Sequence, residues 1–345
     1  MNKTPVIGWD LGGAHLKAAR LDAGGSPERV LQLASPLWQG MEPLQDAVDQ
    51  ARLDLGPAPL HAITMTGEMV DFFAGRVEGV AQLVAMMRRQ LPDATLRFFA
   101  GREGFVDAER AVAAAPLVAS ANWMASAALT AVRVEAGLFV DIGSTTTDLV
   151  PVAGGRILAV GRDDAGRLAA GELEYTGVVR TPLMAVAAEV PFAGERVPLM
   201  AEVFATTADV YRLTGELPET ADQYPAADGG PKTCEGSARR LARMIGRDLE
   251  SAPLDSWRRL AAWLERAQAR RIEDACDRIW SRELLPADAP LVVAGVGRFI
   301  AVELAGRRGL RWVDFADLLP AGAAEHGPIG DCAPAVAVAW LAQQQ

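Results

Sequence analysis

The stretch VIGWDLGG, residues 6–13, decides how the rest of the chain is interpreted. It is apolar up to Asp10, turns on two glycines and resumes an apolar pattern at Leu16, which predicts a β-hairpin over Pro5–Asp22. Glycines at the turn, Gly12 and Gly13, let backbone N–H groups approach an anion with no Cβ atom in the way. Two glycines are also ordinary hairpin chemistry, so this turn alone does not establish a ligand.

Charged residues flank this first turn. Asp10 ends the first strand, where a carboxylate suits a hydrated Mg²⁺ ion, and Lys17 stands on the returning strand, within reach of a phosphate. A solvent-exposed lysine is the alternative for Lys17.

A second stretch, LFVDIGSTTTDLVPV at residues 138–152, repeats the pattern and indicates an internal duplication. Asp141 stands at the end of its first strand, and Asp148 follows the turn; both carboxylates suit a metal ion. The turn gathers amides and hydroxyls that suit phosphate oxygens: Gly143, Ser144, Thr145 and Thr146. The alternative is a Ser/Thr-rich turn whose hydroxyls satisfy only the turn itself.

Two further positions are candidates for a ligand site. Gly295 and Gly297 lie between a buried strand and a helix, where α/β folds bind ligands, although a tight packing turn gives the same pattern. Glu68 directly follows the strand in HAITMTG (61–67), and we expect it to face a cleft. An acid that stabilises a helix N-terminus is the alternative.

The order of predicted elements gives an α/β fold class. Short strands alternate with helices, while a segment from about 180 to 282 is mostly helical by its 3.6-residue apolar period. A chain of 345 residues exceeds the usual size of a single core, so we expect two lobes, 1–136 and 137–345, with the helical insertion in the second. The terminal helix is a candidate to cross back to the first lobe.

Composition excludes several classes of protein. A net charge of −10 and a pI near 5.0 argue against nucleic-acid binding. No apolar run is long enough to cross a bilayer, and the first residues lack a signal-peptide pattern, so we expect a cytoplasmic protein without a membrane partner. Three widely spaced cysteines, Cys234, Cys276 and Cys332, predict reduced thiols.

The two Asp-x-Gly hairpins and the late Gly-x-Gly turn resemble the phosphate 1, phosphate 2 and adenosine motifs of the actin, Hsp70 and sugar-kinase superfamily. That resemblance implies a duplicated actin-like ATPase (ribonuclease H-like) fold with a central cleft. Further blocks resemble the hydantoinase/oxoprolinase-like proteins of the tetrahydromethanopterin-linked one-carbon transfer pathway: TMTGEMVDFF, SANWMA, GELEYTGVVRTPL and DGGPKTCEGSARRLARMIGRD.

The resemblance implies a transferase of methanofuran or methylofuran biosynthesis. The reaction joins the phenol of a γ-glutamyl tyramine or tyrosine to an aminomethylfuran-methyl diphosphate, forming an aryl ether and releasing pyrophosphate. It implies Mg²⁺ as cofactor and these two small molecules as partners, and it leaves a homodimer open. The resemblance assigns three carboxylates to the metal: Asp10, Asp141 and Asp148. It assigns catalysis to Asp10, Asp141 and Glu68, with Glu68 as the proton acceptor for the phenol. The residues that it assigns to substrate binding are Arg180, Asp228, Lys232, Gly295 and Gly297.

Two alternatives stay open at this point. The same hairpins bind ATP in most members of the superfamily, so an ATP-dependent kinase or hydrolase fits the motifs. A non-catalytic scaffold gated by a nucleotide is a different class of protein. ATP turnover favours the first alternative, and nucleotide binding without turnover favours the second.

Overall fold

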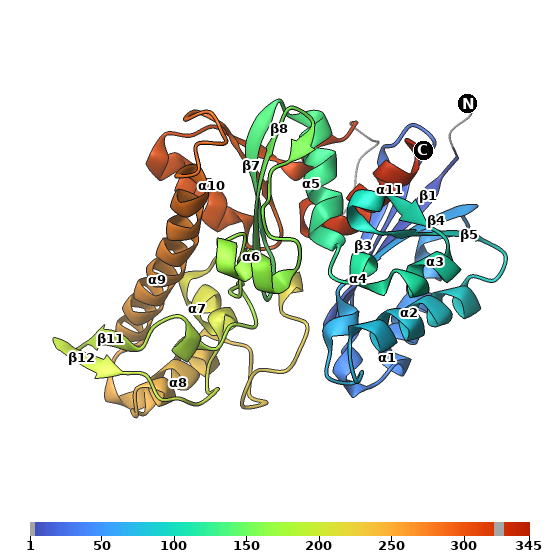
Figure 1. Cartoon of the computed structure of the whole chain (residues 1–345). Helices are drawn as coiled ribbons and strands as arrows, with labels where there is room; N and C mark the ends of the chain where they lie inside the picture. Colours follow the sequence, from blue (N-terminus) through green and yellow to red (C-terminus); the bar gives the residue numbers. More distant parts are fainter. Residues whose placement is uncertain (1–3, 321–327) are drawn as a thin grey trace. The chain divides into compact units, whose positions relative to one another are not determined.

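The computed structural model describes residues 4–320 and 328–345, which form two compact units, each containing a β-sheet (Figure 1). Unit 1 comprises the chain up to Gly137 together with Pro151–Leu158 and Val313–Gln345. Unit 2 comprises Leu138–Val150 and Ala159–Trp312. This division differs from the simple split at residue 137, because the last part of the chain belongs to unit 1.

The sheet of unit 1 has the strand order β3-β2-β1-β4-β5-β6. Strand β1 is antiparallel to β2 and parallel to β4, with Leu11 opposite Met65, so the carboxyl ends of β1 and β4 lie at the same edge. The predicted hairpin is confirmed. The strands are β1 (Val6–Leu11), β2 (His15–Leu21), β3 (Pro27–Ala34), β4 (Leu60–Met65), β5 (Thr95–Phe99) and β6 (Phe105–Val106).

The C-terminal helix α11 (Ala333–Ala342) is part of the core of unit 1. Its sequence is apolar on all sides, as expected for a helix surrounded by protein, and it packs against β1, β2, β4 and α5. Gly8 of β1 approaches the backbone of Ala335 so closely that a Cβ atom on Gly8 would overlap it. The other helices of this unit are α1 (Glu42–Leu55), α2 (Arg76–Gln90), α3 (Ala108–Ala113), α4 (Ala115–Val118) and α5 (Asn122–Arg133).

The second sheet has the order β10-β8-β7-β13-β14, and β9 pairs with β8. It repeats the arrangement of the first sheet, since a hairpin, β7–β8, is followed across the sheet by a parallel neighbour, β13. The repeat confirms the predicted α/β class and the predicted internal duplication. The strands are β7 (Ala136–Ile142), β8 (Thr147–Ala153), β9 (Arg156–Ile157), β10 (Leu173–Glu174), β13 (Leu291–Ala294) and β14 (Trp312–Asp314).

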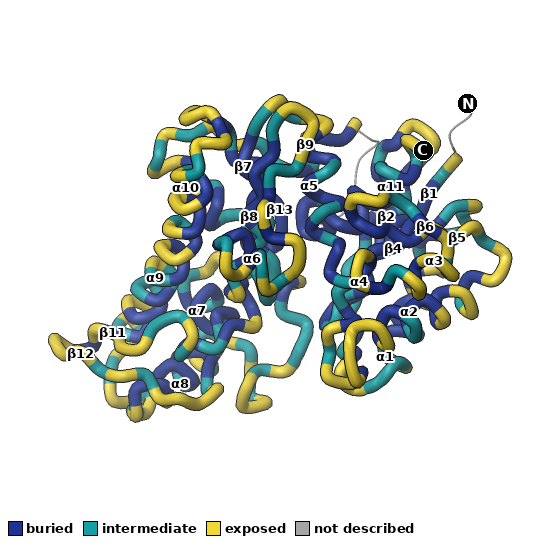
Figure 2. The backbone as a smooth tube through the Cα atoms, viewed as in Figure 1, coloured by how far each residue is buried: buried dark blue, intermediate teal, exposed yellow. Residues whose placement is uncertain are grey.

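The insertion in unit 2 is helical, as predicted, but it also contains a β-hairpin. Strands β11 (Glu189–Phe192) and β12 (Glu195–Pro198) pair antiparallel, and Phe192 stacks on Trp257 of the long helix α9 with ring centroids 4.7 Å apart. The dark and light bands along α9 in Figure 2 show its amphipathic pattern. The helices are α6 (Asp164–Ala170), α7 (Thr207–Thr214), α8 (Cys234–Met244), α9 (Leu254–Trp280) and α10 (Arg298–Arg308).

Short 3-10 helices occupy several connections: Leu37–Gln39, Gly67–Met69, Gly101–Glu103, Leu183–Ala185, Glu219–Ala221, Leu249–Ser251, Phe315–Leu318 and Gly330–Cys332. The three cysteines are free thiols, as predicted, and burial raises the pKa of Cys276 to about 12. Within residues 4–320 and 328–345, no helix combines the length and the apolar character that crossing a membrane requires.

Candidate functional site

The first turn closes tightly at the carboxyl end of β1. The amide of Gly12 donates to the carbonyl oxygen of His15 at 3.1 Å, and a Cβ atom on Gly12 would lie 2.6 Å from that oxygen. Asp10 is 4% exposed, and the side-chain nitrogen of Asn122, at the start of α5, lies 3.5 Å from its Oδ1 atom. Lys17 lies opposite Asp10 in the register of the hairpin, so their side chains share one face of the sheet.

Glu68 lies on a segment that is hydrogen-bonded to the strand end beside this turn. The amide of Thr66 donates to the carbonyl oxygen of Leu11 at 3.1 Å, and Gly67 fits so closely that a Cβ atom there would lie 3.0 Å from the same oxygen. The parallel register of β1 and β4 therefore brings Glu68 to the same edge as the turn, and the expectation that it faces a cleft stays a prediction.

The carboxyl group of Glu68 has two different environments. Its Oε1 atom accepts hydrogen bonds from the amide of Ser120 at 2.9 Å and from the hydroxyl of Ser120 at 3.0 Å. Its Oε2 atom is buried and has no hydrogen-bond partner among the described residues. Burial raises the pKa of Glu68, and the backbone amide of Glu68 itself, the hydrogen bonds from Ser120 and the charge of Arg76 only partly oppose that shift. One carboxyl oxygen is therefore held in place while the other is left without a donor.

A histidine behind the turn is structural. The indole nitrogen of Trp9 donates to Nδ1 of His61 at 2.9 Å, so Nδ1 accepts and the ring proton lies on Nε2, 3.1 Å from the carbonyl oxygen of Ala58. Burial lowers the pKa of His61 to about 4. His61 is therefore neutral near pH 7 and stabilises the pairing of β1 with β4.

The second turn, in unit 2, is braced by the segment that follows β10. The amide of Gly143 donates across the turn to Thr146 at 2.8 Å, and the carbonyl oxygen of Ser144 accepts from the amides of Val179 at 3.1 Å and Arg180 at 2.9 Å. Gly177 is pressed against the turn, since a Cβ atom there would lie 2.5 Å from the carbonyl carbon of Ser144. The backbone of Arg180 thus borders the predicted phosphate site, while its side chain is exposed.

The Gly295–Gly297 turn also contacts the end of β7, where the second turn begins. Ala294 lies opposite Asp141 in the parallel pairing of β13 with β7, and the amide of Gly297 donates to the carbonyl oxygen of Ile142 at 2.8 Å. Gly295 has φ +83°, and a Cβ atom on it would overlap the carbonyl group of Ile142, 2.6 Å from its carbon. The turn therefore packs on the end of β7, and its contact with a ligand stays a prediction.

Asp148 is engaged by an arginine. Arg167 is 2% exposed, and its Nη2 atom donates to Oδ1 of Asp148 at 2.6 Å and to the carbonyl oxygen of Glu172 at 2.9 Å. This ion pair competes with the metal role predicted for Asp148. Among the described residues, no group of three His, Cys, Asp or Glu side chains is arranged to hold a metal ion. Mg²⁺ keeps several waters and needs only one or two carboxylates, so Asp10 and Asp141 remain candidates.

Asp228 and Lys232 belong to a network of ion pairs and hydrogen bonds that stabilises the loop before α8. Asp228 accepts from Arg240 at 3.0 Å and from Arg243 at 3.2 Å, while Lys232 lies 3.4 Å from a carboxylate oxygen of Asp222. Burial alone would raise the pKa of Asp228, but the Gly230 amide and Arg240 outweigh it, so the pKa is lowered.

Arg240 is fully buried and also pairs with Asp209 at 2.7 Å. These contacts give Asp228 and Lys232 a structural role, and their substrate role stays a prediction.

Four residues beside the turns received no role from the sequence. Ser120 and Gly177 occur in blocks that carried the family resemblance, SANWMA and GELEYTGVVRTPL, and so does Asn122. Gln268 of α9 gave no signal except a polar side chain among apolar ones. It is 1% exposed, and its Nε2 atom donates to Thr176 at 2.7 Å and to the carbonyl oxygen of Gly177 at 2.8 Å. Gln268 therefore fixes the segment that braces the second turn.

Comparison with known proteins gives a family and two named relatives. The sequence profile described as hydantoinase/oxoprolinase matches residues 60–344. A protein of Methanocaldococcus jannaschii named (4-{4-[2-(gamma-L-glutamylamino)ethyl]phenoxymethyl}furan-2-yl)methanamine synthase is 27% identical over 299 residues, which cover 86% of this chain and 88% of that protein. A protein of the same name from Methanococcus vannielii is 31% identical over 118 residues, 34% of this chain and 53% of that protein.

Solved structures are also similar over nearly the whole chain. A ROK family glucokinase from Streptomyces griseus is 15% identical with a TM-score of 0.49, covering 99% of this chain and 100% of that one. Component A of (R)-2-hydroxyglutaryl-CoA dehydratase from Acidaminococcus fermentans is 10% identical with a TM-score of 0.48, covering 99% and 98%.

Proposed function

Because the chain belongs to the hydantoinase/oxoprolinase family, we propose that it is a synthase of methanofuran or methylofuran biosynthesis. The proposed reaction condenses an aminomethylfuran-methyl diphosphate with the phenol of a γ-glutamyl tyramine or tyrosine. The name of the relative that matches 86% of this chain supports the pathway. The observation that carries the chemistry is the Glu68 carboxyl group, buried with one oxygen unpartnered among the described residues and with a raised pKa.

Glu68 is the proposed proton acceptor. A phenol has an unperturbed pKa of about 10 and is a poor nucleophile near neutrality unless a base removes its proton. A carboxylate with an ordinary pKa is a weak base for this task, and burial brings the pKa of Glu68 closer to neutrality. The proton passes to Oε2, while Ser120 holds Oε1.

The glycine turns are the proposed cradle for the leaving diphosphate. As the phenol oxygen bonds to the furfuryl carbon, the bond from that carbon to the diphosphate oxygen breaks, and the furan oxygen shares the developing positive charge. Donors aimed at the departing oxygens stabilise this step most when they are already in position. In unit 2, Gly177 packs against the turn and Gln268 holds Gly177 by a hydrogen bond, so the donors of this turn are already in position. The donors are Gly143, Ser144, Thr145 and Thr146, with Gly12, Gly13 and Lys17 on the first turn.

Asp10 and Asp141 are the proposed candidates for holding Mg²⁺, because each is a carboxylate one residue before the end of the first strand of a hairpin. When bound, the ion neutralises charge on the diphosphate oxygens. In the proposal Arg180, Asp228 and Lys232 contact the charged γ-glutamyl part of the phenolic substrate.

One observation favours a second candidate, an ATP-dependent kinase or hydrolase. The Gly295–Gly297 turn packs on the end of β7 beside Asp141, as an adenosine-binding turn of this superfamily would. In that case the same hairpins bind the phosphates of ATP.

The experiment compares the two candidates directly. Purified protein with Mg²⁺ is mixed separately with ATP and with the furan diphosphate plus a glutamylated tyramine or tyrosine, and pyrophosphate, ADP and the ether are followed by mass spectrometry. The proposal expects pyrophosphate and ether in equal amounts, lost in Asp141→Asn and kept in Asp255→Asn, an exposed carboxylate on α9. ADP formation without ether would contradict the synthase and support the second candidate.

A further inference from the structure

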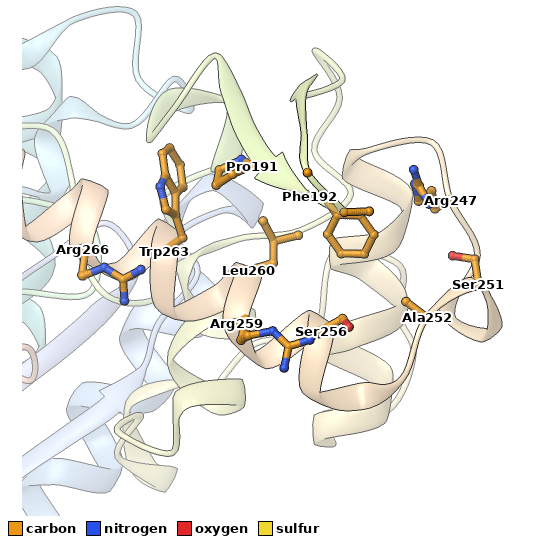
Figure 3. A pocket seen from close by; sticks show the side chains of 12 residues that line it. Pro191, Phe192, Arg247, Ser251, Ala252, Ser256, Arg259, Leu260, Trp263 and Arg266 are labelled. Carbon is orange, nitrogen blue, oxygen red and sulfur yellow. Dashed lines mark hydrogen bonds between the residues drawn. The ribbon is translucent and has the colours of Figure 1, made fainter.

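A separate hollow lies in the helical insertion of unit 2. It is bordered by the β11–β12 hairpin, by helix α9 and by the segment that follows α8, and its volume is about 470 Å³ (Figure 3). Pockets for small organic ligands fall in this size range. None of the residues in the proposed reaction lines it.

The charged side chains that line this hollow all have one sign. Arg247, Arg259 and Arg266 line it, and no acidic residue is among its lining residues. The chain as a whole has 44 acidic and 34 basic residues, so its composition does not account for a pocket of this sign. Arg259 and Arg266 lie about two helical turns apart on α9, so positive charge extends along the hollow.

The arginines of the pocket also differ from their neighbours on the same helix. Arg258 pairs with Asp255 at 3.1 Å, Arg270 with Asp274 at 2.8 Å, and Arg271 with Glu174 at 2.8 Å. In the described part of the chain neither Arg259 nor Arg266 forms an ion pair, and Arg247 forms only a long one, with Glu195 at 4.0 Å. Arg259 and Arg266 therefore bring two guanidinium groups without an ion pair among the described residues to the lining of the hollow, where they raise the potential for an anion.

Two aromatic side chains, Phe192 and Trp263, belong to the rest of the lining, together with small, aliphatic and hydroxyl side chains. Figure 3 shows Leu260 and Trp263 projecting from α9 toward the strand that carries Pro191 and Phe192. The Phe192 ring is fixed by its stacking on Trp257, and the Arg247 guanidinium lies 5.0 Å from its centroid. Trp263 follows Arg259 by four residues, which places both on one face of the helix. The pocket thus contains guanidinium groups that can bind an anion and aromatic side chains that can contact a ring.

The turn of the β11–β12 hairpin, at the rim of the hollow, consists of two small residues. Ala193 has φ +52° and Gly194 has φ +86°, and both line the hollow. Hairpin turns with two positive φ angles favour asparagine before glycine, and alanine in this region is strained. A small side chain at this strained position leaves the rim of the hollow open.

We propose that this pocket binds a small organic anion in which a phosphate or carboxylate group is attached to an aromatic ring. The guanidinium groups of Arg259 and Arg266 pair with the anionic group in the charge-assisted geometry that arginine favours. The ring lies against Trp263 and Phe192. The proposal does not depend on the reaction proposed above, since the pocket shares no residue with it.

The test uses phenyl phosphate and benzoate as probes on the full-length protein labelled with 5-fluorotryptophan. The fluorine resonance of Trp263 is identified by its loss in Trp263→Phe, and its shift is followed as each probe is added. We expect at least one probe to shift this resonance saturably. The dissociation constant should rise about tenfold or more in the double variant Arg259→Gln/Arg266→Gln and stay unchanged in Arg258→Gln and in Asp141→Asn.

Three results would overturn the proposal. The first is no saturable shift with either probe. The second is an equal shift with inorganic phosphate or with benzyl alcohol, because the anion or the ring alone would then suffice. The third is unchanged probe affinity in the double variant, whose fold is verified by the unaltered resonances of the other tryptophans.

Discussion

The two glycine turns share a sequence pattern but have different surroundings. The turn after β1 is bordered by two buried carboxyl groups: Asp10, near Asn122, and Glu68, one oxygen of which has no hydrogen-bond partner among the described residues. The turn after β7 is held on several sides, by Gly177, by the Gly295–Gly297 turn and by the Arg167–Asp148 pair. The first turn therefore lies beside a buried carboxyl group with one oxygen that lacks a donor among the described residues, whereas the second turn is fixed by close packing and an ion pair.

This difference separates catalysis from stability in a way that variants can test. Changes around the second turn should lower the free energy of unfolding, because they disturb buried and close-packed contacts. Changes around the first turn should lower the reaction rate or shift its pH dependence while the fold stays stable.

The largest effect is expected for Arg167→Met. The substitution leaves Asp148, 18% exposed, without its buried partner, and should lower the free energy of unfolding by about 3 kcal/mol. Urea denaturation measures the loss. Arg110→Met is the matched control, because its pair with Glu103 is exposed and should contribute at most about 1 kcal/mol. Equal losses in the two variants would show that the Arg167 pair does not stabilise the second turn.

Glu68→Gln should lower the rate of ether formation about 100-fold, the typical contribution of a general base. It should not destabilise the protein at neutral pH. The folded-state pKa of Glu68 is raised above 4.5, so its stabilising contribution is present below that pH and is lost as the pH rises through the folded-state pKa. Glutamine does not ionise, so the melting temperature of the variant relative to the parent should increase with pH. A full rate would exclude Glu68 as the base.

Gly295→Ala should cost about 2 kcal/mol more than Gly309→Ala. Both glycines have positive φ angles, +83° and +64°, and so share the cost of placing alanine in that region. Only at Gly295 does the new methyl group overlap a neighbour, the carbonyl of Ile142, while the space around Gly309 is open. Urea denaturation of the two variants gives the difference directly. A difference near zero would mean that the backbone at the end of β7 shifts to accommodate the methyl group without a cost in stability.

Ser120→Ala is expected to have the smallest effect, a shift in pH dependence of less than about one unit. The hydroxyl of Ser120 donates to Glu68 and thereby stabilises the carboxylate, so its loss should raise the pKa of Glu68 further. The backbone amide of Ser120 still donates to Oε1 and keeps the side chain in place. The acid limb of the pH–rate profile should move to higher pH with most of the maximal rate retained. A shift to lower pH would contradict the assignment.

Much of the fold could be predicted because its signals are local. Both hairpins are marked by alternating apolar residues and turn glycines, and helix α9 by its apolar period. The strand β3 and the helix α1 were not predicted. The β11–β12 hairpin was also missed, because its Ala-Gly turn is a weaker signal than Asn-Gly in a segment dominated by helices.

The site was predicted less completely, because its contacts join distant parts of the chain. The sequence placed Glu68 at the sheet edge but not Ser120, 52 residues away, as its partner. It proposed a metal at Asp148, while the structure pairs that carboxylate with Arg167. Nothing local distinguishes Gly177 from an ordinary turn glycine; only its fit against Ser144 shows why a side chain is excluded.

The position of helix α11 also constrains how the protein is made. All six strands of the unit 1 sheet have been synthesised at residue 106, yet helix α11, which packs on β1, begins only at Ala333. At about 5–20 residues per second, the interval from residue 106 to residue 333 lasts roughly 10–45 s. During that time the face of β1 that α11 covers lacks this partner, so apolar surface of unit 1 stays uncovered in the growing chain.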